Sequence, residues 1–266
     1  MLKQILKTLD EKLLKKEALR SILKYRQTKM RQKLNREKLY TFEVFYTKNQ
    51  RNSLAELFDI YGSDKGSNKR SGHVFDWNPK SYSDLYSLLF ESKKLEIKCV
   101  FECGIGTNNP QFPSSMGERG KPGASLRAWR DYFPNSEIFG ADIDKSILFN
   151  EQRIRTGYVD QLTRKSIQQF LAEFKLHDID IVIDDGLHTF EAAINLFEEV
   201  SPKLANNGIY LIEDIHPNEI KKFIQYFKQN NLRANYVIFK SNNRIPVGSL
   251  IWIHSSDIET WKFHHL

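Results

Sequence analysis

Short apolar runs alternate with amphipathic runs along most of the chain, and this alternation constrains the fold more than any other feature. Runs typical of parallel strands and of helices follow one another in sequence, which favours a parallel sheet covered by helices on both faces. The predicted strands cover residues 98–102, 137–141, 156–159, 180–183 and 209–212. The predicted helices cover residues 82–90, 124–132, 146–153, 164–174, 190–200 and 218–229.

The last two apolar runs, 235–240 and 248–254, break this pattern. The loop between them is too short for a parallel crossover, so they are expected to form an antiparallel hairpin. The predicted fold class is therefore α/β, with a mostly parallel sheet that ends in antiparallel strands. Five parallel units followed by a hairpin differ from the standard NAD-binding arrangement.

The positive charge of the chain is concentrated in its first 50 residues. The 266-residue chain has a net charge of +7, but residues 1–50 carry 14 Lys and Arg against 5 Asp and Glu, a balance of +9. The other residues carry 26 basic and 28 acidic side chains, a balance of −2. We therefore predict a basic helical arm over 1–50 and one domain over 51–266, in which 51–95 forms a cap on the acceptor side.

Leucine and isoleucine recur at helical spacing in the arm, with Lys, Arg and Gln between them. The favoured interpretation is a helix that packs on its own domain or on a second copy of the chain, so a homo-oligomer is possible. Contact of residues 1–40 with an anionic membrane surface is an alternative that is not favoured. Nucleic-acid binding is disfavoured, because a basic run without a recognised module is weak support and the core is nearly neutral.

The chain has two cysteines, Cys99 and Cys103, and their spacing in one strand makes a bridge between them implausible. No apolar run approaches the roughly 18–20 residues that a bilayer span needs. With no disulfide framework and no signal peptide, we expect a reduced, cytoplasmic protein.

Acidic residues follow two neighbouring predicted strands. Asp184 and Asp185 begin the run Asp-Asp-Gly-Leu-His that ends at His188, and Glu213 and Asp214 follow the next strand. Carboxylates at the ends of buried strands are costly unless they meet a cation or a ligand. Three carboxylates and one imidazole predict a site for Mg²⁺, Mn²⁺ or Ca²⁺ rather than zinc. The alternative is a capping network without a metal.

The first predicted strand ends in the sequence Phe-Glu-Cys-Gly-Ile-Gly, which contains Glu102, Gly104 and Gly106. Glycines at the end of a strand let the backbone approach a ligand closely, and Glu102 could accept a hydrogen bond from a ligand amine. Asn109 stands where the dinucleotide fingerprint has its third glycine, which counts against a pyrophosphate-binding turn. The alternative is a tight turn with an ordinary surface glutamate.

The second and third strands also end in polar residues. Asp142 is placed to bind the two hydroxyls of a ribose, whereas Asp144 is expected to cap the following turn. Asp160 and Gln161 suit the edge of an adenine ring, with helix capping by Asp160 as the alternative.

Five stretches together resemble the class I S-adenosylmethionine-dependent methyltransferases. The resemblance is closest to the metal-dependent sugar O-methyltransferases of macrolide and mycinose biosynthesis and to their relatives in bacterial surface-polysaccharide clusters. It covers roughly three quarters of the chain, from about Tyr61 onward. The stretches are residues 61–66 (YGSDKG), 101–106 (FECGIG), 125–134 (SLRAWRDYFP), 184–188 (DDGLH) and 212–214 (IED).

The resemblance implies a Rossmann-like sheet of seven strands with an antiparallel last strand, and it implies a role for each candidate residue. S-adenosylmethionine and Mg²⁺ (or Mn²⁺) are the expected cofactors. His188 would be the general base, and Asp185, Glu213 and Asp214 would hold the metal. The residues predicted to bind the methyl donor are Glu102, Gly104, Gly106, Asp142, Asp160, Gln161 and Asp184.

A small acceptor, either a sugar or a molecule linked to a nucleotide or phosphate, is expected near Tyr61 and Lys65, and the ammonium of Lys65 could meet its phosphate. A solvated loop lysine is the alternative for Lys65. The loop 107–121 is expected to form a lid or an acceptor wall. The function predicted is O-methyl transfer, in polysaccharide biosynthesis. The alternatives are an NAD-type oxidoreductase, a methyltransferase for a non-sugar phosphorylated molecule, and a non-catalytic scaffold.

Overall fold

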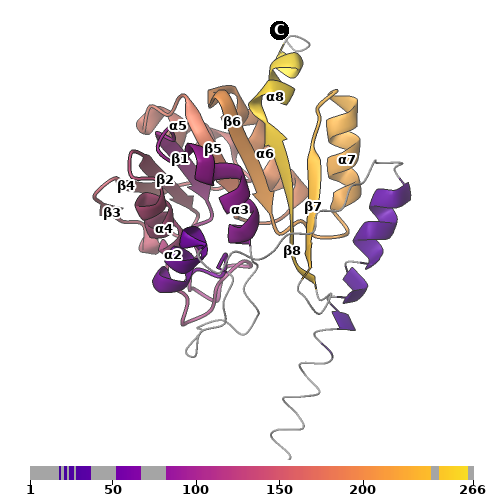
Figure 1. Ribbon diagram of the computed structural model, residues 1–266, viewed down its shortest axis with the longest axis horizontal. Coiled ribbons are helices and arrows are strands. Elements are labelled where there is room, and N and C mark those ends of the chain that lie inside the picture. The colour runs from indigo at the N-terminus through magenta and orange to yellow at the C-terminus, as the bar shows by residue number, and fades with distance from the viewer. Residues whose placement is uncertain are drawn as a thin grey trace, which may run out of the picture.

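The computed structural model describes residues 18, 21–22, 24–26, 28–36, 52–66, 82–240 and 246–262. Its centre is one sheet of eight strands in the order β3-β4-β2-β1-β5-β6-β8-β7 (Figure 1). The strands are β1 (Cys99–Cys103), β2 (Glu137–Asp142), β3 (Asn150–Glu151), β4 (Ile154–Tyr158), β5 (Ile179–Asp184), β6 (Leu204–Glu213), β7 (Asn235–Lys240) and β8 (Pro246–His254). Strands β4, β2, β1, β5 and β6 are parallel to one another, and β8 is antiparallel to β6 and β7.

Helices cover both faces of this sheet. One face packs against α2 (Ser53–Tyr61), α3 (Tyr82–Phe90) and α4 (Ala124–Tyr132). The other packs against α5 (Arg164–Glu173), α6 (Phe190–Val200) and α7 (Ile220–Gln229). Neighbouring residues of a strand point to opposite faces, so Val100 lies in the first layer and Phe101 in the second. The α/β prediction with its C-terminal hairpin is confirmed.

The region 146–153, predicted as a helix, has a different structure. A short 3-10 helix, η2 (Lys145–Ile147), is followed by β3, which forms a tight hairpin with β4. Arg153 takes a left-handed backbone with φ 59° and donates hydrogen bonds to the carbonyls of Arg130, Phe133 and Ser136. These long-range contacts override the local helical pattern, and β3 makes the sheet eight-stranded rather than seven-stranded.

Besides η2 and β3, four described elements were not predicted. They are helix α2, helix α8 (Ser255–Lys262) and the 3-10 helices η1 (Glu91–Lys93) and η3 (Ser201–Lys203). No helix in the part of the chain that the structure describes is both long enough and apolar enough to cross a bilayer.

Part of the basic arm packs on the domain. Residues 28–36 are helical, and Met30 and Leu34 are buried in the same core layer as α7 (Figure 1). The Lys33 ammonium donates a hydrogen bond to the Pro217 carbonyl, 2.9 Å away. These contacts agree with the favoured interpretation of a helix that packs on its own domain. Residues 1–17 and 37–51 of the arm lie outside the described residues.

We expect Leu34→Ala to lower the free energy of unfolding by about 2 kcal/mol, because it removes a buried side chain that joins the arm to the core. Ile22→Ala is the matched control: Ile22 lies in the same arm but is 50% exposed, so its change should stay within about 0.5 kcal/mol. Urea unfolding of the full chain measures both. Equal midpoints for the two variants would mean that the helix is not docked in solution.

Candidate functional site

The predicted site residues lie at one edge of the sheet, where the parallel strands end. Cys103 of β1 pairs with Asp184 of β5, and Asp184 pairs with Ile212 of β6. Because parallel strands end at the same edge, this register brings Glu102, Asp185 and Glu213 close together, although they are far apart in the sequence. The three-dimensional arrangement therefore reproduces the convergence that the sequence predicts.

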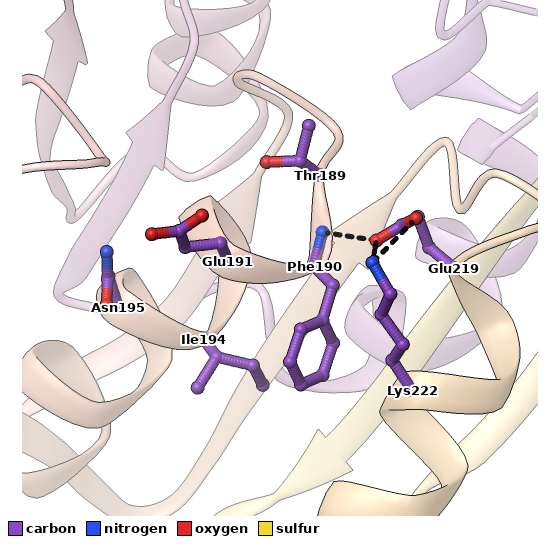
Figure 2. Close-up of a pocket in the computed structure, with 7 residues that line it drawn as sticks. All are labelled: Thr189, Phe190, Glu191, Ile194, Asn195, Glu219 and Lys222. Carbon is purple, nitrogen blue, oxygen red and sulfur yellow. Dashed lines mark hydrogen bonds and ion pairs between the residues drawn. The ribbon is translucent and has the colours of Figure 1, made fainter.

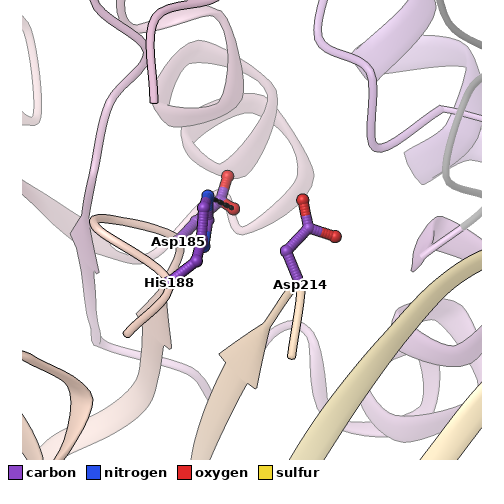
Figure 3. A group of neighbouring side chains, drawn as sticks. All are labelled: Asp185, His188 and Asp214. Carbon is purple, nitrogen blue, oxygen red and sulfur yellow. Dashed lines mark ion pairs between the residues drawn. The ribbon is translucent and has the colours of Figure 1, made fainter. Parts of the chain in front are cut away.

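Asp185, His188 and Asp214 form a group that could hold a metal ion. One ligand atom from each lies within 4.8 Å of the others, and Figure 3 shows them at the tips of adjacent strands. The Nε2 atom of His188 lies 4.0 Å from Oδ1 of Asp185. His188 and Asp214 both have a left-handed backbone, with φ 59° and 53°. Such a conformation is strained for a residue other than glycine, and this strain is often found at functional sites.

Lys65 is buried among three carboxylates instead of being exposed to solvent. Its side chain is 2% exposed, and its ammonium lies 2.5 Å from Oδ2 of Asp185, 2.7 Å from Oε2 of Glu213 and 3.5 Å from Oε1 of Glu102. It is therefore not a solvated loop lysine, and its contact with an acceptor phosphate stays a prediction. The three carboxylates raise the pKa of Lys65 well above its usual value despite its burial, so the ammonium stays charged.

Glu213 is engaged by two other side chains, and its role as a metal ligand stays a prediction. Its carboxylate accepts hydrogen bonds from the Lys65 ammonium and from the Tyr86 hydroxyl, and the side chain is 1% exposed. Among the described residues, the group of potential ligand atoms within 4.8 Å of one another comes from Asp185, His188 and Asp214.

Two tyrosines at this edge were missed by sequence reasoning. Tyr82 donates a hydrogen bond to Oδ1 of Asp214 at 2.5 Å, and Tyr86 donates one to Glu213. Burial, then the neighbouring carboxylates, raises the pKa of both hydroxyls well above the usual value, so both remain donors. The signal in the sequence is their spacing of four residues in a predicted helix, which puts both on one face.

Glu102 is fully buried beside this cluster. Its Oε2 atom accepts a hydrogen bond from the Trp129 indole at 2.8 Å. Its Oε1 atom has no hydrogen-bond partner among the described residues. Burial raises the pKa of Glu102 to about 7, an effect that the Lys65 ammonium opposes.

The two predicted cofactor glycines are needed for contacts within the chain. Gly104 has φ +90°, and a Cβ atom there would lie 2.2 Å from the Asp185 carbonyl oxygen. Gly106 has φ +86°, and a Cβ atom there would lie 2.2 Å from the Met116 sulfur, in the predicted lid 107–121. Glycine therefore lets both the Asp185 turn and the lid approach the end of β1.

Asp142 and Asp144 occupy the end of β2 as predicted. The Asp142 carboxylate accepts hydrogen bonds from the backbone N–H groups of Ile105 and Asp144, both at 2.9 Å. Asp144 caps η2 through Ser146, which confirms its capping role. Burial raises the pKa of Asp142. The backbone contacts fix the orientation of the Asp142 carboxylate.

Gln161 connects the end of β4 to the turn that carries Asp185 and His188. Its Nε2 atom donates to Oδ1 of Asp184 at 2.7 Å, and its Oε1 atom accepts from the Leu187 N–H at 2.8 Å. Burial raises the pKa of Asp184 to about 6, and the Oδ2 atom of Asp184 has no hydrogen-bond partner among the described residues. The Gln161 amide is therefore used inside the protein, whereas the sequence placed it at an adenine edge.

The remaining predicted residues lie at the margin of the site. Asp160 accepts hydrogen bonds from Leu162 N–H and the Thr163 hydroxyl and so orders the turn before α5. The Tyr61 hydroxyl contacts Asp131 and Arg130, on α4. Two apolar side chains that sequence reasoning missed, Ile143 and Leu162, follow β2 and β4 and are 43% and 50% exposed. The position of Ile143 directly after Asp142 is the feature of the sequence that could have indicated a role at the site.

A shallow hollow of about 620 Å³ lies between the starts of α6 and α7 (Figure 2). The hollow is lined by Thr189, Phe190, Glu191, Ile194, Asn195, Glu219 and Lys222. It begins one residue after His188 but contains none of the predicted site residues. The titratable groups described above therefore lie outside it.

Comparisons with known proteins find similarity to methyltransferases. Residues 118–215 match a family described as a methyltransferase domain. The chain is 24% identical to a solved structure titled MycE methyltransferase from the mycinamycin biosynthetic pathway in complex with Mg, SAH and mycinamycin VI. The TM-score is 0.53, and the match covers 76% of this chain and 54% of that one. The fold is thus that of the methyltransferases.

Curated relatives agree with this class. One relative is 8-demethyl-8-alpha-L-rhamnosyl tetracenomycin-C 2'-O-methyltransferase of Streptomyces olivaceus. The chain is 30% identical to it over 162 residues, and this match covers 61% of this chain and 37% of the relative. It is 35% identical over 131 residues to demethylmacrocin O-methyltransferase of Streptomyces fradiae, 49% of this chain and 30% of the relative. The chain thus spans well under half the length of these relatives. The match of residues 118–215 to a methyltransferase domain agrees with the class that the sequence predicts.

We expect Gln161→Ala to lower the free energy of unfolding by about 1–3 kcal/mol, because it leaves Asp184 and the Leu187 N–H without their partner. Gln168→Ala is the matched control, since Gln168 bonds Glu199 on the exposed surface and should change stability by no more than about 0.5 kcal/mol. Urea unfolding compares the two. A Gln161 variant as stable as the Gln168 variant would show that Gln161 does not hold the turn.

Proposed function

We propose that this chain is an S-adenosylmethionine-dependent O-methyltransferase that uses a divalent metal ion and acts on a hydroxyl group of a sugar. The observation that carries this proposal is that Asp185, His188 and Asp214 lie together at the edge of the sheet, next to the end of β1. Support comes from the MycE structure of the same fold, which is a complex with Mg and SAH.

The residues at the ends of β1 and β2 fit the methyl donor. The buried Oε1 atom of Glu102 lacks a hydrogen-bond partner among the described residues and could accept a bond from the amino group of the donor. Asp142 would accept the two ribose hydroxyls. Ile143 and Leu162 present exposed apolar side chains from the ends of β2 and β4, which suits a planar adenine ring.

The donor set also fits a hard divalent ion. Asp185 and Asp214 would supply oxygen ligands, which Mg²⁺ and Mn²⁺ prefer. Because these ions prefer oxygen to nitrogen ligands, the imidazole of His188 would be available for proton transfer. A divalent ion bound there would supply Lewis acidity, which lowers the cost of ionising an acceptor hydroxyl.

His188 would accept the proton of the acceptor hydroxyl while the methyl group leaves sulfur and bonds to oxygen. The Asp185 carboxylate, 4.0 Å from Nε2, would stabilise the imidazolium that forms. A base in this position typically contributes about 10²–10⁴-fold to the rate. Holding donor and acceptor in line would supply much of the remaining acceleration.

The acceptor is proposed from the names of the relatives, two of which describe methyl transfer to rhamnosyl groups of tetracenomycin C. A bacterial surface polysaccharide or its precursor stays a prediction, as does a nucleotide-linked or other phosphorylated acceptor. Absence of nucleic-acid binding, a homo-oligomer and a cytoplasmic location also stay predictions.

We expect S-adenosylhomocysteine to stabilise the full chain and NAD⁺ to leave its melting temperature unchanged. At ~100 times its dissociation constant, a ligand of the folded state adds about 2.7 kcal/mol. This amounts to a rise in Tm of roughly 5–10 °C for a chain of this size. A rise with NAD⁺ and none with S-adenosylhomocysteine would instead support the oxidoreductase alternative.

We expect His188→Ala to reduce methyl transfer by about 10²-fold or more, with little effect on the dissociation constants of S-adenosylhomocysteine and Mn²⁺. Transfer of labelled methyl groups to a panel of rhamnosides and nucleotide sugars measures activity, and calorimetry measures binding. His216→Ala, in the loop after β6, is the matched control and should retain activity. If His188→Ala also loses Mn²⁺, the imidazole is a metal ligand rather than the base.

A further inference from the structure

The described part of the basic arm carries three cations along one side of its helix. Arg26, Lys29 and Lys33, the basic row, are spaced by three and four residues, which aligns them on that side. Met30 and Leu34, on the neighbouring face, are buried in the core layer that contains α7 (Figure 1). Docking of the helix therefore holds the basic row at a defined place on the domain.

That place is the loop that follows β6. The Lys33 ammonium donates a hydrogen bond to the Pro217 carbonyl at 2.9 Å. Pro217 follows Asp214 by three residues, which span at most about 11 Å even when fully extended. The basic row thus lies beside the segment that leads away from the sheet edge and from the proposed site residue Asp214.

The pKa of His216, which lies in this loop, reports the field of the basic row. Burial and then the Arg26 guanidinium lower the pKa of His216 below its usual value. Glu219 opposes this effect, whereas Lys33 and Lys29 add to it. The imidazole is therefore neutral near pH 7, and the positive charge at this loop comes from the arm.

Little negative charge balances the basic row. Arg26 and Lys29 form no ion pair with an acidic side chain of the described residues. Lys29 instead lies over the Tyr25 ring, with Nζ 5.7 Å from its centroid, and Glu219 is paired with Lys222 at 3.0 Å. Cations that are held on a docked helix without acidic partners favour an anionic ligand, and phosphate oxygens suit both Arg and Lys.

We propose that the basic row binds a phosphate on the acceptor, so that the acceptor is a sugar whose anomeric carbon carries a phosphate or diphosphate. The inference rests on the proposed function, because it takes the methylated hydroxyl to lie at the sheet edge beside Asp214. A sugar diphosphate is long enough to bridge the distance from this edge to the loop at Pro217. The acceptor class thus differs from the rhamnosyl groups of tetracenomycin C for which two relatives are named.

The first test measures binding of inorganic pyrophosphate to the full chain by calorimetry in EDTA. We expect the double variant Arg26→Gln/Lys29→Gln to bind pyrophosphate about tenfold more weakly or worse, because it loses charge-assisted hydrogen bonds. Lys33 is kept, since it also anchors the arm. Arg26→Lys/Lys29→Arg retains both charges and should bind pyrophosphate like the wild type.

Lys24→Gln/Lys203→Gln is the matched control, because it removes the same net charge. Lys24 lies two residues before Arg26 and so on the opposite side of the helix, and Lys203 lies just before β6, at the far end of that strand. This control should bind pyrophosphate like the wild type. Equal affinity in the wild type, the control and Arg26→Gln/Lys29→Gln would show an adventitious ion only and would overturn the inference.

The second test compares rhamnose 1-phosphate with methyl α-L-rhamnoside as acceptors. We expect Arg26→Gln/Lys29→Gln to raise the KM of the phosphorylated acceptor by about tenfold at nearly constant kcat, because uniform binding energy is lost. The KM of the neutral rhamnoside should not change. A wild type that prefers the neutral rhamnoside would contradict the inference.

UDP and geranyl diphosphate distinguish the two sources of such a phosphate. Tighter binding of UDP than of pyrophosphate supports a nucleotide-linked acceptor, and tighter binding of geranyl diphosphate supports a lipid-linked one. Failure of S-adenosylhomocysteine to stabilise the wild type would count against the proposed function alone, because a loss of pyrophosphate binding confined to Arg26→Gln/Lys29→Gln would still establish a phosphate site. Normal stabilisation by S-adenosylhomocysteine without binding of any of the three phosphates would overturn the inference alone.

Discussion

The buried charge at the ends of the parallel strands is the interaction on which the rest of the site depends. Three adjacent strands, β1, β5 and β6, each end in a carboxylate that is removed from water, and taking such groups out of water costs several kcal/mol per ion. The Lys65 ammonium and the hydroxyls of Tyr82 and Tyr86 offset this cost. Because these three side chains come from the segment before β1, that segment must dock on the sheet for the cluster to be stable.

This dependence joins the predicted cap, residues 51–95, to the chemistry of the sheet. Helix α3 supplies Tyr82 and Tyr86, and the turn after α2 supplies Lys65. Each of them contacts an acidic residue at the edge and so fixes how that residue is oriented. The division between cap and domain stays a prediction, but the described contacts cross it at the functional site.

Sequence periodicity was sufficient to predict the sheet and its acidic edge, because periodicity is a property of residues that are close in sequence. Strands and helices have different periods, and parallel strands put their carboxyl ends together. The partners of the edge could not be predicted in this way, since Lys65 lies 120 residues from Asp185 and 148 from Glu213 in the sequence. The hairpin at β3 was missed for the same reason, because Arg153 is held by distant carbonyls.

The strained residues at the edge show why the supporting contacts matter for function. His188, in the turn after β5, and Asp214, directly after β6, hold left-handed conformations. Each such residue costs about 1–3 kcal/mol, which the surrounding contacts must offset. Gln161 and Gly104 hold the turn that carries His188, and Tyr82 holds Asp214. Strands in a sheet lie about 4.8 Å apart. The spacing of β1, β5 and β6 therefore sets the distance between the proposed methyl-donor residues and the proposed metal and base, and a rigid edge keeps that distance constant.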